Sequence, residues 1–233
     1  VSGSLGKTTV ARLITRLLPL SGKHPGLACS SGPFVARRCI DAGDSANWGA
    51  AHRILMNRAV EAAVFENGSD TILSEGLAYD RCQVGVITNV GAARHFGRYD
   101  VSTAEQVFTI LRTQVDLVLP TGAAVLNASQ PMLVEMAPLC DGEVIFFAAD
   151  PTLPAIVEHR AQGKRAVYAR NGRVILASGD QEREIVGLHG VPLTSDGEAE
   201  FQVENVLAAS AAAWALGIGP EIIRTGLETF PVA

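Results

Sequence analysis

Hydrophobic residues recur along the chain with two alternating spacings. Over residues 8–18 they lie three or four positions apart, which is the spacing of an amphipathic helix. Over residues 84–90 they form a nearly continuous run, Val-Gly-Val-Ile-Thr-Asn-Val, as in a strand that is buried on both faces. Because helix-like and strand-like segments alternate in this way, the sequence predicts an α/β fold in which helices flank a mostly parallel sheet.

The remaining segments continue the same alternation. Further helices are expected over 50–66, 103–113, 132–140, 154–162, 202–216 and 221–229, the first of them running into a strand near its end. Further strands are expected over 25–29, 34–40, 115–119, 122–127 and 144–148. Residues 164–177 differ, because two strand-like runs flank Asn171–Gly172, a dipeptide typical of the turn of an antiparallel hairpin. No internal repeat interrupts the pattern, so one domain is expected over residues 1–233.

Composition and charge narrow the class of protein. The chain has 48% hydrophobic and 18% charged residues and a net charge of −5, as expected for a well-packed globular protein. Its Lys and Arg residues form no basic stripe, which argues against nucleic acid as a partner. No run approaches the roughly 18 apolar residues of a membrane span, and no signal peptide is recognisable. The four cysteines lack metal-binding or redox spacing and are expected to be reduced thiols of a cytoplasmic protein.

Candidate chemistry is concentrated at the start of the chain, where residues 3–8 read Gly-Ser-Leu-Gly-Lys-Thr. Gly3 and Gly6 allow backbone N–H groups to approach a phosphate closely, and Lys7 can reach the β- and γ-phosphates of a nucleotide. Thr8 offers a hydroxyl to Mg²⁺, and the positive end of the following helix points at the anion. The segment therefore predicts a phosphate-binding loop; the alternative is a chance glycine-rich turn.

The position of this loop carries two further expectations. The slot of the first glycine in the general G-x-x-x-x-G-K-[ST] pattern is held by Val1, so the loop has the shorter G-x-x-G-K-T form. A phosphate loop follows a buried parallel strand, and only Val1 and Ser2 precede it here. Since the chain also lacks an initiator Met, we expect it to be a piece of a longer polypeptide.

Five segments together resemble the Mur ligase superfamily, and more closely the Mur-ligase-like half of the cyanophycin synthetases. They occur in the family's order and at plausible spacing over almost the whole chain. The stretch from Glu75 to Val90 is the most specific of them, and it argues against another phosphate-loop amide ligase such as a folate-polyglutamate type. The five segments are 3–9, 75–82, 84–90, 124–128 and 201–209.

The resemblance implies the fold of a Mur ligase central domain and an ATP-dependent, Mg²⁺-dependent amide-forming ligase. A substrate carboxylate attacks the γ-phosphate of ATP, and an amine then displaces phosphate from the acyl phosphate. In the cyanophycin synthetases this half adds arginine to the side-chain carboxylates of a poly-aspartate chain. An upstream ATP-grasp half of the same polypeptide adds the aspartate. The implied partners are that half and the aspartate–arginine polymer or its precursors, and a homo-oligomer is expected.

The resemblance also assigns roles to individual residues. Lys7 and His95 become the catalytic candidates, and Thr8 and Glu66 the Mg²⁺ ligands. Asn89 matches the Thr-Asn pair at a strand end. The nucleotide-binding candidates are Gly3, Gly6, Lys7, Thr8, Thr9, Asn127 and Asn205. A purely structural role is the alternative for several of these residues. Glu66 would then be a solvated acid at a helix end, His95 would be a packed or surface side chain, and the asparagines would stabilise turns or helix caps.

Several departures from the family pattern fall on its chemistry. Leu5 stands in place of the loop asparagine, His95 lies one position late, and no lysine occurs between Lys23 and Lys164 to provide a carbamylated metal ligand. The chain also stops where the family's C-terminal lid begins. These departures leave an alternative open. The domain would then be a catalytically inactive structural or oligomerisation domain of a short cyanophycin synthetase, which polymerises aspartyl-arginine dipeptides through its ATP-grasp half.

Overall fold

Helices and strands alternate as the sequence predicts. The computed structural model describes residues 1–91 and 99–231. Its helices are α1 (Lys7–Leu20), α2 (Trp48–Leu55), α3 (Ser69–Ser74), α4 (Ala104–Asp116), α5 (Pro131–Met136), α6 (Pro154–Ala161), α7 (Glu200–Ala215) and α8 (Pro220–Glu228). Its strands are β1 (Pro25–Cys29), β2 (Gly32–Val35), β3 (Arg38–Cys39), β4 (Ala62–Phe65), β5 (Cys82–Ile87), β6 (Val118–Asn127), β7 (Glu143–Ala148), β8 (Arg165–Arg170), β9 (Arg173–Ser178) and β10 (Gln181–Gly187). The predicted α/β class is confirmed.

The larger sheet has six strands in the order β10-β9-β8-β7-β6-β5. Strands β5 to β8 pair in parallel, whereas β8, β9 and β10 pair antiparallel at one edge. The predicted hairpin is confirmed as β8–β9, and both turn residues have positive φ, 51° at Asn171 and 69° at Gly172. These angles explain the Asn-Gly pair, since the tight hairpin turn needs left-handed backbone at both positions. The third antiparallel strand, β10, was not predicted.

The residues before the loop join this sheet to a second, four-stranded sheet of order β3-β2-β1-β4. Ser2 forms parallel bridges to Asn67, just after β4, and to Ile87 at the end of β5. The extended residues Val1 and Ser2 therefore lie between the two sheets, as the loop motif predicts. The Val1 nitrogen donates a hydrogen bond to the Phe65 carbonyl at 2.7 Å, which fastens this residue to the end of β4.

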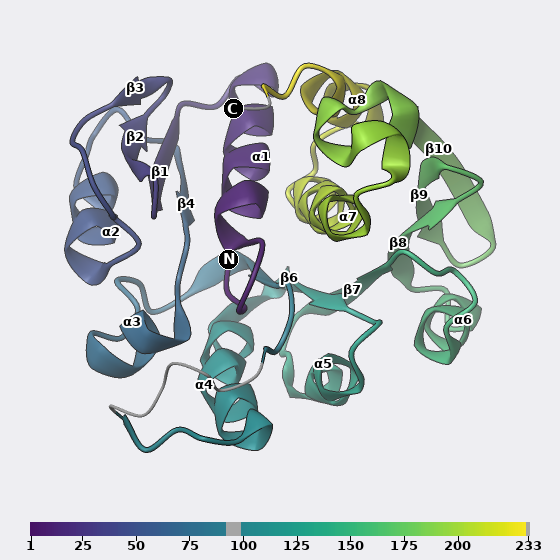
Figure 1. Cartoon of the computed structure of the whole chain (residues 1–233), viewed down its shortest axis with the longest axis horizontal. Coiled ribbons are helices and arrows are strands. Elements are labelled where there is room, and N and C mark those ends of the chain that lie inside the picture. Colours follow the sequence, from purple (N-terminus) through teal and green to yellow (C-terminus); the bar gives the residue numbers. More distant parts are fainter. Residues whose placement is uncertain (92–98, 232–233) are drawn as a thin grey trace.

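Figure 1 shows α1, α7 and α8 on one face of the six-stranded sheet and α4, α5 and α6 on the other. Successive residues of β6 divide between the two resulting cores. Ala123 and Val125 pack in the core that contains α1 and α7, whereas Ala124 and Leu126 pack in the core that contains α4. Burial on both faces explains why the central strands read as continuous apolar runs.

Three sequence-based boundaries are wrong. The expected helix over 50–66 ends at Leu55, and β4 begins at Ala62. The Asn57 side chain accepts a hydrogen bond from the Ala59 backbone at 3.0 Å, a local turn that interrupts the helix. The strand that follows is fixed by its parallel pairing with β1, which helical spacing alone does not reveal. The strand expected near the end of 50–66 is confirmed.

The second wrong boundary concerns the strands expected over 115–119 and 122–127. Val115 still belongs to α4, and one strand, β6, runs without a break from Val118 to Asn127. The segment expected to be extended over 34–40 is instead divided between β2 and β3, which turn at Ala36 with φ 53°. The short helix α3 was not predicted.

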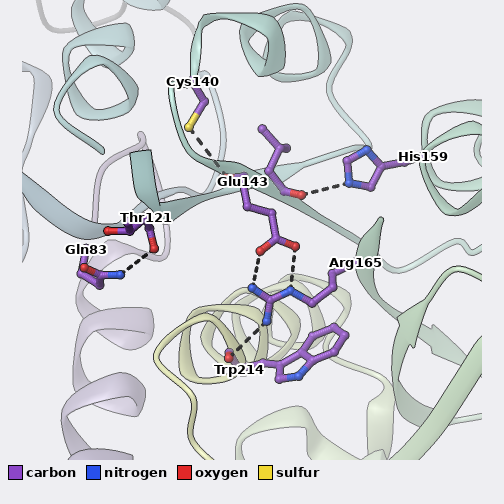
Figure 2. Close-up of polar contacts among 8 residues, drawn as sticks. Gln83, Thr121, Cys140, Glu143, His159, Arg165 and Trp214 are labelled. Carbon is purple, nitrogen blue, oxygen red and sulfur yellow. Dashed lines mark hydrogen bonds and ion pairs between the residues drawn. The ribbon is translucent and has the colours of Figure 1, made fainter. Parts of the chain in front are cut away.

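At the amino ends of β7 and β8, a polar cluster fastens α7 to the sheet (Figure 2). Arg165 Nε donates to Glu143 at 2.7 Å, and Arg165 Nη1 donates to the Trp214 carbonyl at 3.3 Å. The guanidinium also lies 4.8 Å from the centroid of the Trp214 ring, within the range of a cation–π contact. Nearby, His159 of α6 contacts the Val144 carbonyl at 3.0 Å, and burial lowers the pKa of its imidazole. The cluster holds the carboxyl end of α7 at the amino ends of β7 and β8. The amino end of α7 therefore lies near the carboxyl ends of these strands.

Candidate functional site: a phosphate loop and its surroundings

The loop between Ser2 and α1 requires glycine at both of its glycine positions. Gly3 and Gly6 have φ of 131° and 82°, in the region that side-chain-bearing residues rarely adopt. A Cβ on Gly3 would lie 2.2 Å from the Thr88 hydroxyl, and one on Gly6 would lie 2.1 Å from the Asn205 side-chain oxygen. Gly6 is the N-cap of α1, and no side chain caps this helix end. The first N–H groups of α1 are thus available to an anion.

Asn89, after β5, holds the shape of this loop. Its Oδ1 accepts hydrogen bonds from the backbone N–H groups of Ser4 and Leu5 at 3.1 and 2.9 Å. Its Nδ2 donates to the Leu5 carbonyl at 3.0 Å, and the Thr88 hydroxyl donates to the same carbonyl at 2.6 Å. The Leu5 side chain itself is 64% exposed. Leu5 therefore contributes its backbone to the loop and directs its apolar side chain to solvent.

Thr8 and Glu66 meet beside the start of α1. The Thr8 hydroxyl lies 2.9 and 3.0 Å from the two carboxylate oxygens of Glu66, and 2.9 Å from the Ser30 hydroxyl. Glu66 also accepts a hydrogen bond from the Ser30 backbone N–H at 2.9 Å and is only 5% exposed. Because Glu66 is buried, it is not a solvated acid at a helix end, which was the alternative interpretation of this residue.

This arrangement fits Mg²⁺. Glu66 takes part in no ion pair among the residues that the structure describes, so a buried carboxylate is left without a cation. Over residues 1–91 and 99–231, no three His, Cys, Asp or Glu side chains gather into a metal cage. Mg²⁺ needs none, because it is commonly held by one or two protein oxygens together with nucleotide phosphates and water.

Lys7 bends back over the loop, where its Nζ donates to the Ser4 carbonyl at 3.2 Å. The ammonium group is thus held at the Ser4 carbonyl of the loop, and Lys7 is itself the first residue of α1. Thr9 occupies the first turn of α1, next to Thr8. His95, the other catalytic candidate, lies outside the described residues.

The two candidate asparagines lie behind the loop and are almost completely buried. Asn127, at the end of β6, donates to the Thr88 carbonyl at 3.1 Å and to Glu204 at 3.3 Å. Asn205, on α7, donates to Gln202 at 3.0 Å, and its oxygen faces Gly6. Both amides therefore support the loop and its neighbours; direct contact with a nucleotide stays a prediction.

A cavity of about 720 Å³ opens at Glu204, the residue to which Asn127 donates. It lies between the carboxyl ends of β7 and β8 and the first turns of α7, where Phe201 and Glu204 line it. Desolvation raises the pKa of the Glu204 carboxyl. The volume is within the range of about 300–1,000 Å³ that small-molecule sites occupy. A site at the carboxyl edge of the sheet is also the usual arrangement in open α/β folds.

Two residues of this region were missed by sequence reasoning. Ser30 lies in the turn between β1 and β2, and only the pairing of β1 with β4 brings it to Glu66. Glu204 was seen as part of the segment 201–209, but nothing in its spacing indicated that it faces a cavity. The one available signal was that Glu204 directly precedes Asn205, a candidate nucleotide-binding residue, in the sequence.

A buried polar network supports the loop from the side opposite the cavity. The Oε1 of Gln114, on α4, accepts hydrogen bonds from the Ser2 hydroxyl at 3.2 Å, Asn67 Nδ2 at 3.2 Å and the Tyr79 hydroxyl at 2.9 Å. Asn67 Nδ2 also donates to Tyr79 at 2.9 Å, and burial raises the pKa of the Tyr79 phenol. The network joins the strand before the loop to the residue that follows Glu66. It therefore fixes the separation between the loop and the candidate metal ligand.

Comparison with known proteins identifies the family. Residues 1–213, which contain the loop, Glu66 and both asparagines, match the Mur ligase middle domain. The chain belongs to the Mur ligase middle-domain family. The resemblance carried by residues 3–9 and the four later segments is thereby confirmed.

Individual relatives agree with this assignment to the Mur ligase family. The cyanophycin synthetase of Synechocystis sp. is 37% identical over 231 residues, which cover 99% of this chain and 26% of that protein. The cyanophycin synthetase of Crocosphaera subtropica is 36% identical over 231 residues, which again cover 99% of this chain and 26% of that protein. Among solved structures, a UDP-N-acetylmuramoyl-L-alanyl-D-glutamate–2,6-diaminopimelate ligase has a TM-score of 0.72 at 15% identity, covering 100% of this chain and 46% of that one. The predicted Mur ligase fold is confirmed, and the chain spans 26% of the length of these synthetases.

No helix in the described part of the chain combines the length and the apolar character needed to cross a membrane.

Proposed function

We propose that this domain binds Mg²⁺·ATP and forms an amide between a carboxylate and an amine. The proposal extends to the addition of arginine to aspartate side chains, because relatives at 36–37% identity are named cyanophycin synthetases. The observation that carries it is the convergence of the Thr8 hydroxyl and the buried Glu66 carboxylate beside the uncapped start of α1. An anion site and a cation site adjoin there, as phosphoryl transfer from a nucleotide requires.

The chain's own residues would act by positioning and by charge. The N–H groups at the start of α1 would hold the phosphates, and Lys7 would offset the negative charge that develops on them. Thr8 and Glu66 would hold Mg²⁺, which neutralises phosphate charge when bound. Asn89 would keep the loop in the shape that accepts the phosphates.

The proposed reaction has two balanced steps. A carboxylate oxygen attacks the γ-phosphorus, the bond from that phosphorus to the bridging oxygen breaks, and ADP leaves. The amine nitrogen of the second substrate then attacks the acyl carbon, phosphate leaves, and the nitrogen loses a proton. In this proposal the domain belongs to a cytoplasmic polypeptide that forms homo-oligomers and that also contains an ATP-grasp half. Its substrate is an aspartate–arginine polymer or a precursor of that polymer.

The second candidate function is that of a structural domain without turnover. It is favoured by the absence of any lysine from residue 24 to 163, which removes the family's carbamylated metal ligand. Glu66 is buried and has no ion-pair partner within residues 1–91 and 99–231, which favours the first candidate. The two differ in whether nucleotide binding leads to phosphoryl transfer.

The test measures ADP release and trapped acyl phosphate. Hydroxylamine replaces the amine and converts an acyl phosphate to a hydroxamate, which is detected only after phosphoryl transfer. With the ATP-grasp half of the polypeptide disabled, we expect ADP and hydroxamate in equal amounts from the otherwise unchanged protein with an aspartate peptide, and neither from Lys7→Ala or Glu66→Gln. Lys164→Ala, at an exposed lysine in the turn before β8, is the matched control and should behave as the wild type. Tight Mg²⁺·ATP binding without ADP release would support the structural candidate.

A further inference from the structure

Two arginines, Arg12 and Arg16, follow Thr8 along α1 and lead away from the candidate metal site. Thr8, Arg12 and Arg16 are spaced four residues apart, so they lie on one side of the helix at intervals of about 6 Å. Arg12 and Arg16, together with Arg37 after β2, line a groove of about 280 Å³. Its other walls include Phe34, and also Phe230 near the carboxyl end, whose ring lies 6.0 Å from the Arg12 guanidinium.

The three arginines of this groove have no acidic partner among the described residues, which is also true of Arg38, Arg58 and Arg81 outside it. Within residues 1–91 and 99–231, every ion pair involves other arginines, and none includes Arg12, Arg16 or Arg37. None of the described residues that line the groove is acidic. The Nε of Arg16 is buried and has no hydrogen-bond partner in the described part of the chain, although the Arg16 Nη2 donates to Thr229 at 3.3 Å. A groove with unpaired cations in a chain of net charge −5 is prepared for an anionic ligand.

The place of the groove relates it to the proposed reaction. The 720 Å³ cavity lies beside β7, β8 and α7, whereas Glu66 and Ser30 lie on the other side of the loop, toward β1 and β2. A nucleotide with its base in the cavity would direct its terminal phosphate toward Glu66. The groove begins one helical turn beyond Thr8 on that same side. A ligand in the groove would therefore approach the end of the nucleotide at which phosphoryl transfer takes place.

We propose that this groove binds a carboxylate-rich peptide and guides one of its carboxylates to the nucleotide. Guanidinium groups pair with carboxylates through paired hydrogen bonds, a geometry that lysine does not offer. In an extended peptide, side chains on one side recur about every 7 Å, close to the spacing of about 6 Å between successive turns of α1. Repeated carboxylates on an extended chain thus match Arg12 and Arg16 in register. The catalytic meaning of this groove rests on the proposed ligase function, but the binding itself does not.

The experiment measures the binding of a fluorescent oligo-aspartate to the protein by anisotropy, without nucleotide. Arg37→Gln is the first variant, because Arg37 is exposed and its removal should not disturb the fold. Arg38→Gln is the matched control: it removes the same charge one residue away, outside the groove. We expect Kd to rise about three- to fivefold in Arg37→Gln and in Arg12→Gln, and about tenfold or more in the double variant. Arg38→Gln should change Kd by less than about twofold.

Two outcomes would overturn the proposal. Equal weakening by Arg37→Gln and Arg38→Gln would mean that the peptide senses only the net charge of this surface. Competition by sulfate as effective as that by unlabelled oligo-aspartate, at equal total charge, would mean a simple anion site. Lys7→Ala separates this proposal from the proposed function, since it should abolish Mg²⁺·ATP binding and leave oligo-aspartate binding unchanged. Conversely, Arg37→Gln should leave Mg²⁺·ATP binding unchanged.

Discussion

The Thr8 hydroxyl donates to the Glu66 carboxylate, 2.9 and 3.0 Å from its two oxygens, across 58 residues of sequence. One partner belongs to the first turn of α1 and the other follows β4. Because Ser2 forms bridges on both of its sides, to Asn67 and to Ile87, the loop cannot move away from Glu66 without breaking the junction between the two sheets. The candidate metal site is thus built on rigid strands.

Glu66→Gln should abolish the Mg²⁺ dependence of nucleotide binding. Glutamine keeps the size of the side chain and an oxygen for Thr8 and Ser30, but it removes the charge that a divalent cation needs. We expect the Kd for Mg²⁺·ATP to rise more than about tenfold, toward the Kd for ATP with EDTA, in calorimetric titrations. Glu228→Gln, at an exposed glutamate of α8, is the control. If Glu66→Gln still distinguished Mg²⁺·ATP from free ATP, Glu66 would not be the metal ligand.

Local signals predicted a good part of the fold, and long-range pairing decided the rest. The loop before α1, the buried strand β5 and the Asn171–Gly172 hairpin each have a pattern that one segment determines by itself. The helix expected over 50–66 failed because β4 exists through its pairing with β1. For the same reason Ser30 was missed, since it reaches Glu66 only when these two strands lie side by side.

The candidate site shows the same division between local and tertiary information. The Gly-Lys-Thr segment indicated an anion site, and the structure brings Thr8 and Glu66 together there. The close approach of Asn205 to Gly6 depends on how α7 packs beside α1, which no spacing within either segment encodes. Leu5, which departs from the family pattern, is accommodated because Asn89 and Thr88 bind only its backbone.

Asn89→Ala should weaken nucleotide binding by loosening the loop. The substitution removes three hydrogen bonds to the backbone of Ser4 and Leu5, each worth about 1 kcal/mol. We expect the Kd for Mg²⁺·ATP to rise by about tenfold or more in calorimetric titrations. Asn89→Asp should be at least as poor, because the carboxylate accepts from the two N–H groups but repels the Leu5 carbonyl and the phosphates. Affinity unchanged in both variants would show that the loop keeps its shape without Asn89.

Gln114→Leu should destabilise the fold by about 1–3 kcal/mol, because it leaves the Tyr79 hydroxyl, the Ser2 hydroxyl and the Asn67 amide without their shared acceptor. Urea unfolding followed by circular dichroism gives this free energy. The double variant Gln114→Leu/Tyr79→Phe should lose less stability than the sum of the two single variants, since each removes a group that the other needs. Additive losses would mean that the three hydrogen bonds do not act as a network.

Acid stability should depend on Glu182, whose carboxylate is held by Arg170 of β8 and Arg160 of α6. Its hydrogen bond with Arg170, another from the Tyr168 hydroxyl, and the nearby Arg160 lower the pKa of this carboxyl from 4.5 to about 2. Because the folded-state pKa is depressed, the folded protein favours the ionised form. The stabilisation is therefore complete above pH 4.5 and is lost as the pH falls toward 2. The tyrosine hydroxyl gives Glu182 a contact that Glu184, the other paired glutamate of β10, does not show.

Glu182→Gln should therefore lower the free energy of unfolding at pH 7, and the difference from the wild type should shrink as the pH falls from 4.5 to about 2. Urea titrations at closely spaced pH values measure this difference, which cancels the contribution of the other carboxylates. Glu198→Gln, at an exposed glutamate before α7, should give a curve parallel to that of the wild type. A constant difference between Glu182→Gln and the wild type over this range would show that its arginine and tyrosine contacts do not favour the ionised carboxylate.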